Sequence, residues 1–134
     1  GANLATLAFR EPLPDAPADR RLVMQEAIGD CQVPNFATRI LARAFGARQM
    51  TPASEAVFGL TPVTSPASPG VALSQYAIPG SLMRYTPPDT NVIPAMDNNT
   101  HSDSVRLTSA LAQVRALFRS GDIVQPCEGP CDPD

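Results

Sequence analysis

The sequence contains no lysine, no tryptophan and one histidine, and aromatic residues make up 5% of its 134 positions. All ten of its positive charges are therefore arginines; the net charge is −3 and the isoelectric point is about 5.0. Because affinity for phosphates depends on concentrated Lys and Arg, and no basic cluster is present, this composition argues against nucleic acid as the main partner. Any site built on imidazole must use His101, the one histidine.

Long apolar runs are also missing. No run approaches the roughly 18 residues that a membrane-spanning helix needs, and prolines interrupt the charge-poor stretch 56–96. We therefore expect no transmembrane segment. The first residue is Gly rather than Met, which indicates a processed product, a fragment or a cleavage scar.

The apolar spacing predicts a mainly α fold, a single domain with about four short helices. In the first, Val23, Met24, Ala27 and Ile28 fall on one helical face. A glycine suited to a helix end lies at or beside the end of each predicted helix. The predicted helices span 17–29, 35–47, 52–58 and 103–120.

The last of these helices has the clearest pattern. Leu107, Leu111, Val114 and Phe118 recur at spacings of four, three and four, which places Leu111 at the centre of the predicted apolar stripe. Ser102 is the expected cap of this helix. In the second helix Asn35 is the expected cap, after Pro34.

The remaining segments are expected to be extended. Residues 1–16 are predicted to be an arm with a short strand over 5–10, whose candidate mate is 122–125 in the Cys-containing acidic tail 122–134. The two predicted terminal strands could pair with each other or add to a partner's sheet.

Residues 60–101 combine many prolines with few charges, which predicts an extended, irregular, apolar segment. Four short Ala-rich helices offer little surface to cover it. We therefore expect contact with another chain to order this segment. The predicted partner-binding anchors are Tyr76, Ile78, Leu82, Met83 and Tyr85.

No catalytic signature is present: the chain lacks a G-x-S-x-G, a phosphate-binding loop, an H-E-x-x-H and a dinucleotide fingerprint. His101 lies just before a predicted helix start and is interpreted as an exposed residue near the helix cap. The acidic residues are spread through the chain rather than paired. The sequence therefore predicts no enzyme, no catalytic residue, no cofactor and no metal site.

The three cysteines give the strongest local signal. Cys127 and Cys131 enclose a Gly-Pro turn, which makes them a candidate disulfide. Free thiols on a cytosolic terminus are the alternative. Cys31 is interpreted as a small core residue, although it could pair with either tail cysteine. A tail disulfide would imply an oxidising compartment or a virion exterior.

These features favour a non-enzymatic structural or assembly subunit, such as a minor capsid or cement protein or a component of a bacterial envelope machine. Its partners would be other protein chains, in a homo- or hetero-oligomer, and its location the virion or an extracytoplasmic space. The first alternative is a secreted or periplasmic binding module or effector, stabilised by a disulfide. The second is a small enzyme without a recognisable motif, which would need a pocket that contains His101 or clustered carboxylates.

Overall fold

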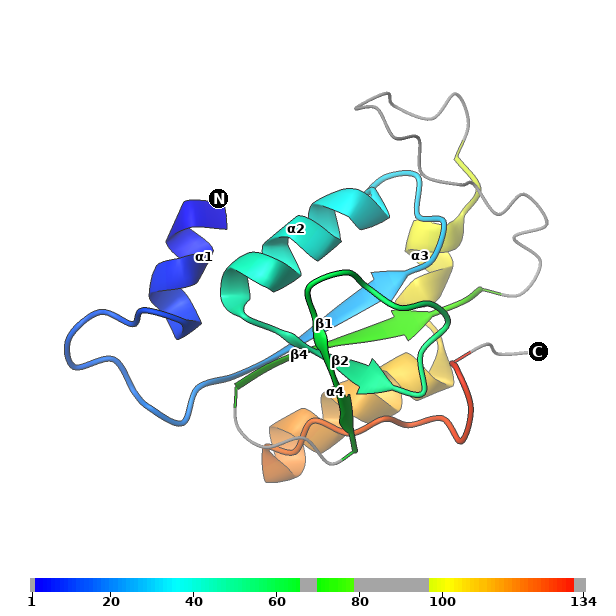
Figure 1. Cartoon of the computed structure of the whole chain (residues 1–134). Helices are drawn as coiled ribbons and strands as arrows, with labels where there is room; N and C mark the ends of the chain where they lie inside the picture. Colours follow the sequence, from blue (N-terminus) through cyan, green and yellow to red (C-terminus); the bar gives the residue numbers. More distant parts are fainter. Residues whose placement is uncertain (1, 66–69, 79–96, 132–134) are drawn as a thin grey trace.

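The computed structural model describes residues 2–65, 70–78 and 97–131. These residues form an α/β fold with a four-stranded, wholly parallel sheet (Figure 1), so the prediction of a mainly α protein was wrong. The strand order is β1-β4-β2-β3. The strands are β1 (Arg21–Ala27), β2 (Arg48–Thr51), β3 (Thr61–Thr64) and β4 (Gly70–Tyr76).

Helices cover both faces of the sheet (Figure 1). They are α1 (Ala2–Phe9), α2 (Asn35–Phe45), α3 (Thr100–Ser104) and α4 (Thr108–Ser120). Ala42 and Phe45 of α2 pack against Leu73, and Phe9 of α1 joins that cluster. Leu117 of α4 packs on the opposite face, in the cluster around Ala72. In the described part of the chain, no helix has the length and apolarity needed to span a bilayer.

β4 is an inner strand between β1 and β2, and every residue from 71 to 78 is buried. Its side chains alternate between the two layers, Val71 and Leu73 facing α2 and Ala72 facing α4. The expectation of an irregular segment over 60–101 is therefore wrong for β3 and β4. A parallel strand buried on both faces shows no alternation of polarity, so its pattern resembles any short apolar run.

The same ambiguity explains β1, where the sequence predicted a helix over 17–29. Leu22 and Met24 pack towards α2, while Val23 packs in the cluster on the α4 face. Glu26 lies outside the apolar face of the predicted helix, yet it is 2% exposed, and Arg39 and Gln75 bind its carboxylate. Apolar groups at adjacent positions fitted one side of a helix as well as two sides of a strand.

A helix does occur where the sequence placed the second one, as α2, and Gly46 ends it with a φ of 71°. Asn35 is not its cap: its side chain is buried and bonds the loop after β1. The predicted strand over 5–10 is instead part of helix α1. Residues 52–58 form bends and irregular backbone rather than a helix, after a cis Thr51–Pro52 peptide.

The predicted helix over 103–120 is two helices, α3 and α4, separated by a turn at Val105 and Arg106. Its buried face also differs from the predicted stripe, because Leu111 is 40% exposed and Phe118 is 84% exposed. Ala110 and Gln113 are the buried residues of α4. Gln113, which lies outside the predicted apolar stripe, is thus buried, whereas Leu111 at the centre of that stripe is not.

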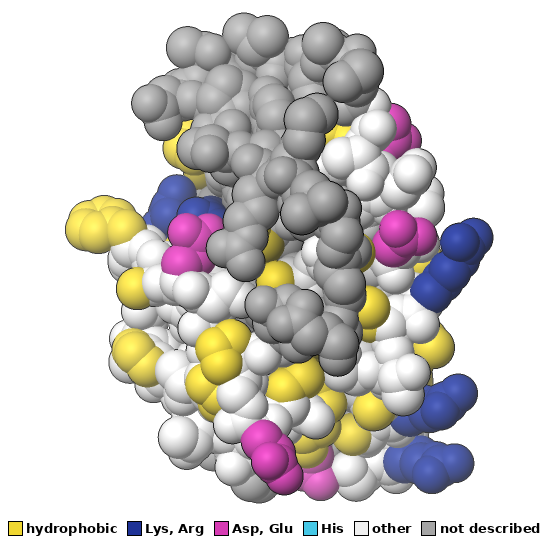
Figure 2. Space-filling view, turned by 90° about the vertical axis from the view of Figure 1, so that its right-hand side faces the viewer, with side chains coloured by type: hydrophobic (Ala, Val, Ile, Leu, Met, Phe, Trp, Pro, Cys, Tyr) yellow, Lys and Arg dark blue, Asp and Glu magenta, His cyan; other side chains and the backbone are white. Residues whose placement is uncertain are grey.

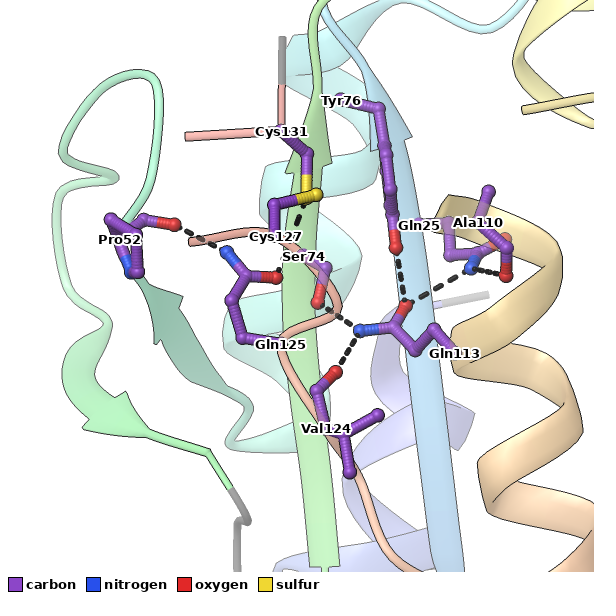
Figure 3. The surroundings of a disulfide bond; sticks show 10 residues. All are labelled: Gln25, Pro52, Ser74, Tyr76, Ala110, Gln113, Val124, Gln125, Cys127 and Cys131. Atoms are coloured by element: carbon purple, nitrogen blue, oxygen red, sulfur yellow. Dashed lines mark hydrogen bonds between the residues drawn. A yellow bond between two sulfur atoms is a disulfide. The ribbon is translucent and has the colours of Figure 1, made fainter. Parts of the chain in front are cut away.

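The Gln113 side chain makes four hydrogen bonds that connect α4 to the sheet and to the tail (Figure 3). Its Oε1 accepts hydrogen bonds from the Tyr76 hydroxyl and from Gln25 Nε2, both at 3.0 Å. Its Nε2 donates to Ser74 Oγ at 2.6 Å and to the Val124 carbonyl at 2.7 Å. Burial raises the pKa of Tyr76, which keeps the phenol a donor. Because both polar atoms of the side chain have hydrogen-bond partners, burial of this glutamine leaves no polar group unsatisfied.

The tail lies beside the end of β4 and forms a bridge rather than the predicted strand over 122–125. Cys127 and Cys131 form a disulfide with an S–S distance of 2.08 Å (Figure 3). The Ala77 N–H donates to the Cys131 carbonyl at 2.8 Å, beside an isolated parallel bridge from Tyr76 to Cys131. The disulfide-closed tail therefore covers Tyr76.

Candidate functional site

The candidate site lies at the carboxyl ends of β1 and β4. These strands are neighbours, but β1 leads into α2 on one face of the sheet and β4 leads towards α3 and α4 on the other (Figure 1). Neighbouring parallel strands whose following helices lie on opposite faces leave a crevice outside the strand ends, where open parallel sheets bind ligands. A pocket of about 230 Å³ occupies this place. Its lining includes Glu26, Asp30, Thr38, Tyr76, His101 and Ser104.

Asp30 projects from the loop that follows β1 and is 6% exposed. Its Oδ1 accepts the backbone N–H groups of Gln32 at 2.8 Å and Val33 at 2.9 Å. Its Oδ2 lies 2.8 Å from Nδ1 of His101. Both carboxylate oxygens thus have fixed partners, and the side chain has one orientation.

His101 is the second residue of α3, and 71 positions separate it from Asp30. Its side chain is 41% exposed, whereas that of Asp30 is 7% exposed. It lies at a helix start with a partly exposed side chain, as the sequence suggested, but it also binds Asp30, which the sequence did not predict. Because the histidine borders the pocket with one nitrogen bound to a buried acid, the pair has the layout of an oriented general base.

The hydrogen bond also determines the tautomer. An ionised Asp30 can only accept, so the neutral imidazole carries its proton on Nδ1 and has its lone pair on Nε2. A histidine in this form can take a proton from a hydroxyl or a water at Nε2. The carboxylate then stabilises the imidazolium that results.

Glu26 is a second carboxylate in the pocket lining, and its oxygens are already bound. Oε1 accepts from Arg39 Nε at 2.8 Å, and Oε2 accepts from Gln75 Nε2 at 2.9 Å. Arg39 also pairs with Glu55. Burial raises the pKa of Glu26 in spite of the lowering effect of Arg39. Through these hydrogen bonds Glu26 of β1 connects Arg39 of α2 to Gln75 of β4 at the pocket.

Replacing Glu26 by glutamine is expected to flatten the pH dependence of stability in the acid range. Burial raises the pKa of Glu26 above its ordinary value of 4.5, so the folded protein holds this proton more tightly than the unfolded chain does. The resulting stability is fully present below pH 4.5 and is lost as the pH rises through the folded-state pKa.

Urea unfolding between about pH 4 and pH 7 measures this contribution. The wild type should lose stability relative to Glu26→Gln as the pH rises, and a difference that stays constant across the range would contradict the argument. Glu55→Gln is the matched control. It removes the other carboxylate on Arg39, half exposed at 50%, and is expected to cost less than about 1 kcal/mol.

The residues predicted from sequence to anchor a partner lie elsewhere. Tyr76 is 1% exposed and Ile78 is 7% exposed, and both are buried within this chain. Leu82, Met83 and Tyr85 lie outside the described residues. A role of these five residues in binding another chain stays a prediction.

Cys31 is a buried free thiol that pairs with neither tail cysteine. Its Sγ donates to Asp97 Oδ1 at 3.2 Å, and burial raises its pKa, so it is held as a thiol rather than as a nucleophilic thiolate. Among the described residues, no group of three His, Cys, Asp or Glu side chains is placed to hold a metal ion.

The surface at this end of the sheet is mixed. Figure 2 views the molecule from the side towards which β1 and β4 point. On the described atoms visible there, hydrophobic side chains lie in small groups between polar atoms, and arginines gather along one edge. That visible surface does not form one broad apolar patch of the kind that obligate interfaces bury.

Asp30 was not predicted as a site residue because β1 was not predicted as a strand. A carboxylate in the loop directly after a parallel strand stands at the edge where such sheets place their sites. With a helix predicted over 17–29, Asp30 was an ordinary charge beyond a helix end.

Comparison of the chain with family models, with curated proteins and with solved structures found no match.

Proposed function

We propose that this chain carries the acid–base pair of a hydrolytic active site, with His101 as the proton carrier and Asp30 as the residue that orients it. One observation carries the proposal. The 2.8 Å bond from His101 Nδ1 to a buried Asp30 oxygen lies at the wall of a pocket, at the carboxyl ends of neighbouring parallel strands.

The chemistry is proton transfer in both directions. His101 Nε2 removes the proton of an attacking hydroxyl or water as that oxygen bonds to an ester or related acyl carbon. The imidazolium then returns the proton to the leaving oxygen as its bond to the carbon breaks. Asp30 remains ionised throughout and stabilises the imidazolium.

The attacking group comes from elsewhere. Ser104, the nearest hydroxyl in chain position within the pocket lining, donates to the His101 backbone carbonyl at 2.8 Å rather than to the ring. No hydroxyl of the described residues is hydrogen-bonded to the imidazole ring, so the nucleophile that we propose is a water. In α/β-type hydrolases the chain order is nucleophile, acid, histidine, and here the acid also precedes the histidine. This agreement in order is an analogy at the level of the site.

The Cys127–Cys131 disulfide supports an oxidising, extracytoplasmic location for this activity. The assembly role expected from the sequence stays a prediction. Part of its basis was the expectation that contact with another chain orders the segment over 60–101, and β4, which lies in that segment, pairs within this chain on both sides. A binding module would use the same pocket without bond cleavage, so turnover separates that alternative from an enzyme.

The test is hydrolysis of p-nitrophenyl acetate by the purified chain between about pH 5 and pH 9. Free imidazole also cleaves this activated ester, so we expect the purified chain to exceed the rate of buffer that contains imidazole at the same concentration. A rate indistinguishable from buffer at every pH would overturn the proposal. Labelling by a fluorophosphonate probe indicates a hydroxyl nucleophile, whereas turnover without labelling indicates water or direct attack by the imidazole.

A further inference from the structure

Asn98 bridges the two segments that supply the proposed acid–base pair. Its Nδ2 donates to the Gly29 carbonyl at 2.8 Å, and its Oδ1 accepts the Thr100 N–H at 3.2 Å. Gly29 directly precedes Asp30, and Thr100 directly precedes His101. One side-chain amide therefore connects the residues on the amino side of both members of the pair.

The Asp30 loop is held from a second side by Asn35. Its Oδ1 accepts the Gly29 N–H at 2.9 Å, and its Nδ2 donates to the Ala27 carbonyl at 2.7 Å. Both backbone polar groups of Gly29 thus bind asparagine side chains. Gly29 has a φ of 79°, a conformation that favours glycine and turns the chain from β1 into this loop.

His101 lies in a short helix. α3 is five residues long, and a helix of that length has little stability of its own. The adjacent Asp97 adds two contacts to the Asp30 loop, accepting from Gln32 Nε2 at 2.7 Å and from Cys31 Sγ at 3.2 Å. The Asn99 N–H and these two donors lower the pKa of Asp97, which keeps it an ionised acceptor. All these contacts join the loop after β1 to the turn before α3.

We infer that Asn98 is a positioning residue that holds His101 Nδ1 against Asp30. The inference rests on the proposed function for the purpose of the pair, but its geometric content can be tested without any activity. The hydrogen bond between Asp30 and His101 persists only while the loop after β1 and the start of α3 keep their relative positions. A misplacement of about 1 Å at such a pair can cost about a hundredfold in rate.

The single histidine makes the test direct, because every imidazole signal of this chain belongs to His101. In ¹⁵N-histidine-labelled wild type, above the pH at which the ring titrates, we expect the signature of one fixed tautomer with the proton on Nδ1. In Asn98→Ala and Asn98→Asp we expect averaged ¹⁵N shifts from exchange between tautomers. Asn98→Asp keeps the acceptor for Thr100 and loses the donor to Gly29, so it isolates that half of the bridge.

Asn99→Gly is the matched control. Asn99 is exposed and has a φ of 60°, which glycine adopts without strain, so this variant should keep the wild-type tautomer signature. If Asn98→Ala does not fold, as judged by circular dichroism, Asn98→Asp and Asn98→Ser decide the question. Wild-type ¹⁵N shifts in the folded Asn98 variants would overturn the inference.

Activity supplies a second readout that separates this inference from the proposed function. If the ester is hydrolysed, the Asn98 variants should lower kcat about ten- to a hundredfold and leave KM within about twofold. A change in tautomer signature without any wild-type hydrolysis would support the positioning role and refute the proposed function. Hydrolysis by the wild type, together with wild-type tautomer signatures in the Asn98 variants, would support the proposed function and refute the positioning role.

Discussion

Asp30→Asn is expected to lower the rate of p-nitrophenyl acetate hydrolysis by about 10³-fold or more, while the protein stays folded. The asparagine Oδ1 can still accept the N–H groups of Gln32 and Val33, so the loop after β1 keeps its shape. Its amide Nδ2 then faces His101 Nδ1 as a donor. The imidazole must present a lone pair there and carry its proton on Nε2, where it can no longer act as a base.

The measurement is the pH–rate profile of the variant beside those of His101→Gln and Asp122→Asn. His101→Gln removes the proton carrier and should fall to the buffer rate. Asp122→Asn makes the same chemical change as Asp30→Asn at an exposed residue beyond α4, and should match wild type. Retention of activity within about tenfold in Asp30→Asn would show that the oriented tautomer is not what drives the reaction.

Leu73→Asp is expected to prevent folding, whereas the same change at Leu111 is expected to cost about 1 kcal/mol or less. Leu73 is 0% exposed, pairs with Met24 of β1 on one side and Gln49 of β2 on the other, and packs against Ala42 of α2. A carboxylate there would be buried without a partner, at a cost of several kcal/mol. That is a large share of the roughly 5–15 kcal/mol that stabilises an ordinary domain.

Both variants replace a leucine by an aspartate, so the difference between their stabilities reflects only where the residue lies in the fold. The sequence placed Leu111 at the centre of an apolar helix face, but at 40% exposure an aspartate there can reach water. Thermal unfolding followed by circular dichroism should show a cooperative transition near that of wild type for Leu111→Asp and none for Leu73→Asp. A folded Leu73→Asp variant would mean that β4 is not a buried inner strand of the sheet.

The sequence by itself was sufficient for features that depend on neighbouring residues. Helix α2 has a one-sided apolar pattern and Gly46 directly after it, and it forms close to the predicted bounds. Cys127 and Cys131 are four residues apart around a Gly-Pro turn, so they can meet without help from the rest of the fold, and they form a disulfide. In both cases the interactions are local.

The tertiary structure decided everything that depends on what covers a segment. β1 and β4 are strands because helices lie on both faces of the sheet, and burial on both faces removes the alternation that would have identified them. Glu26, Gln75 and Gln113 are buried because each finds its hydrogen-bond partners on other elements. Asp30 and His101 meet only because the parallel pairing of β1 with β4 brings the ends of both strands to one edge, and no local pattern of residues specifies that pairing.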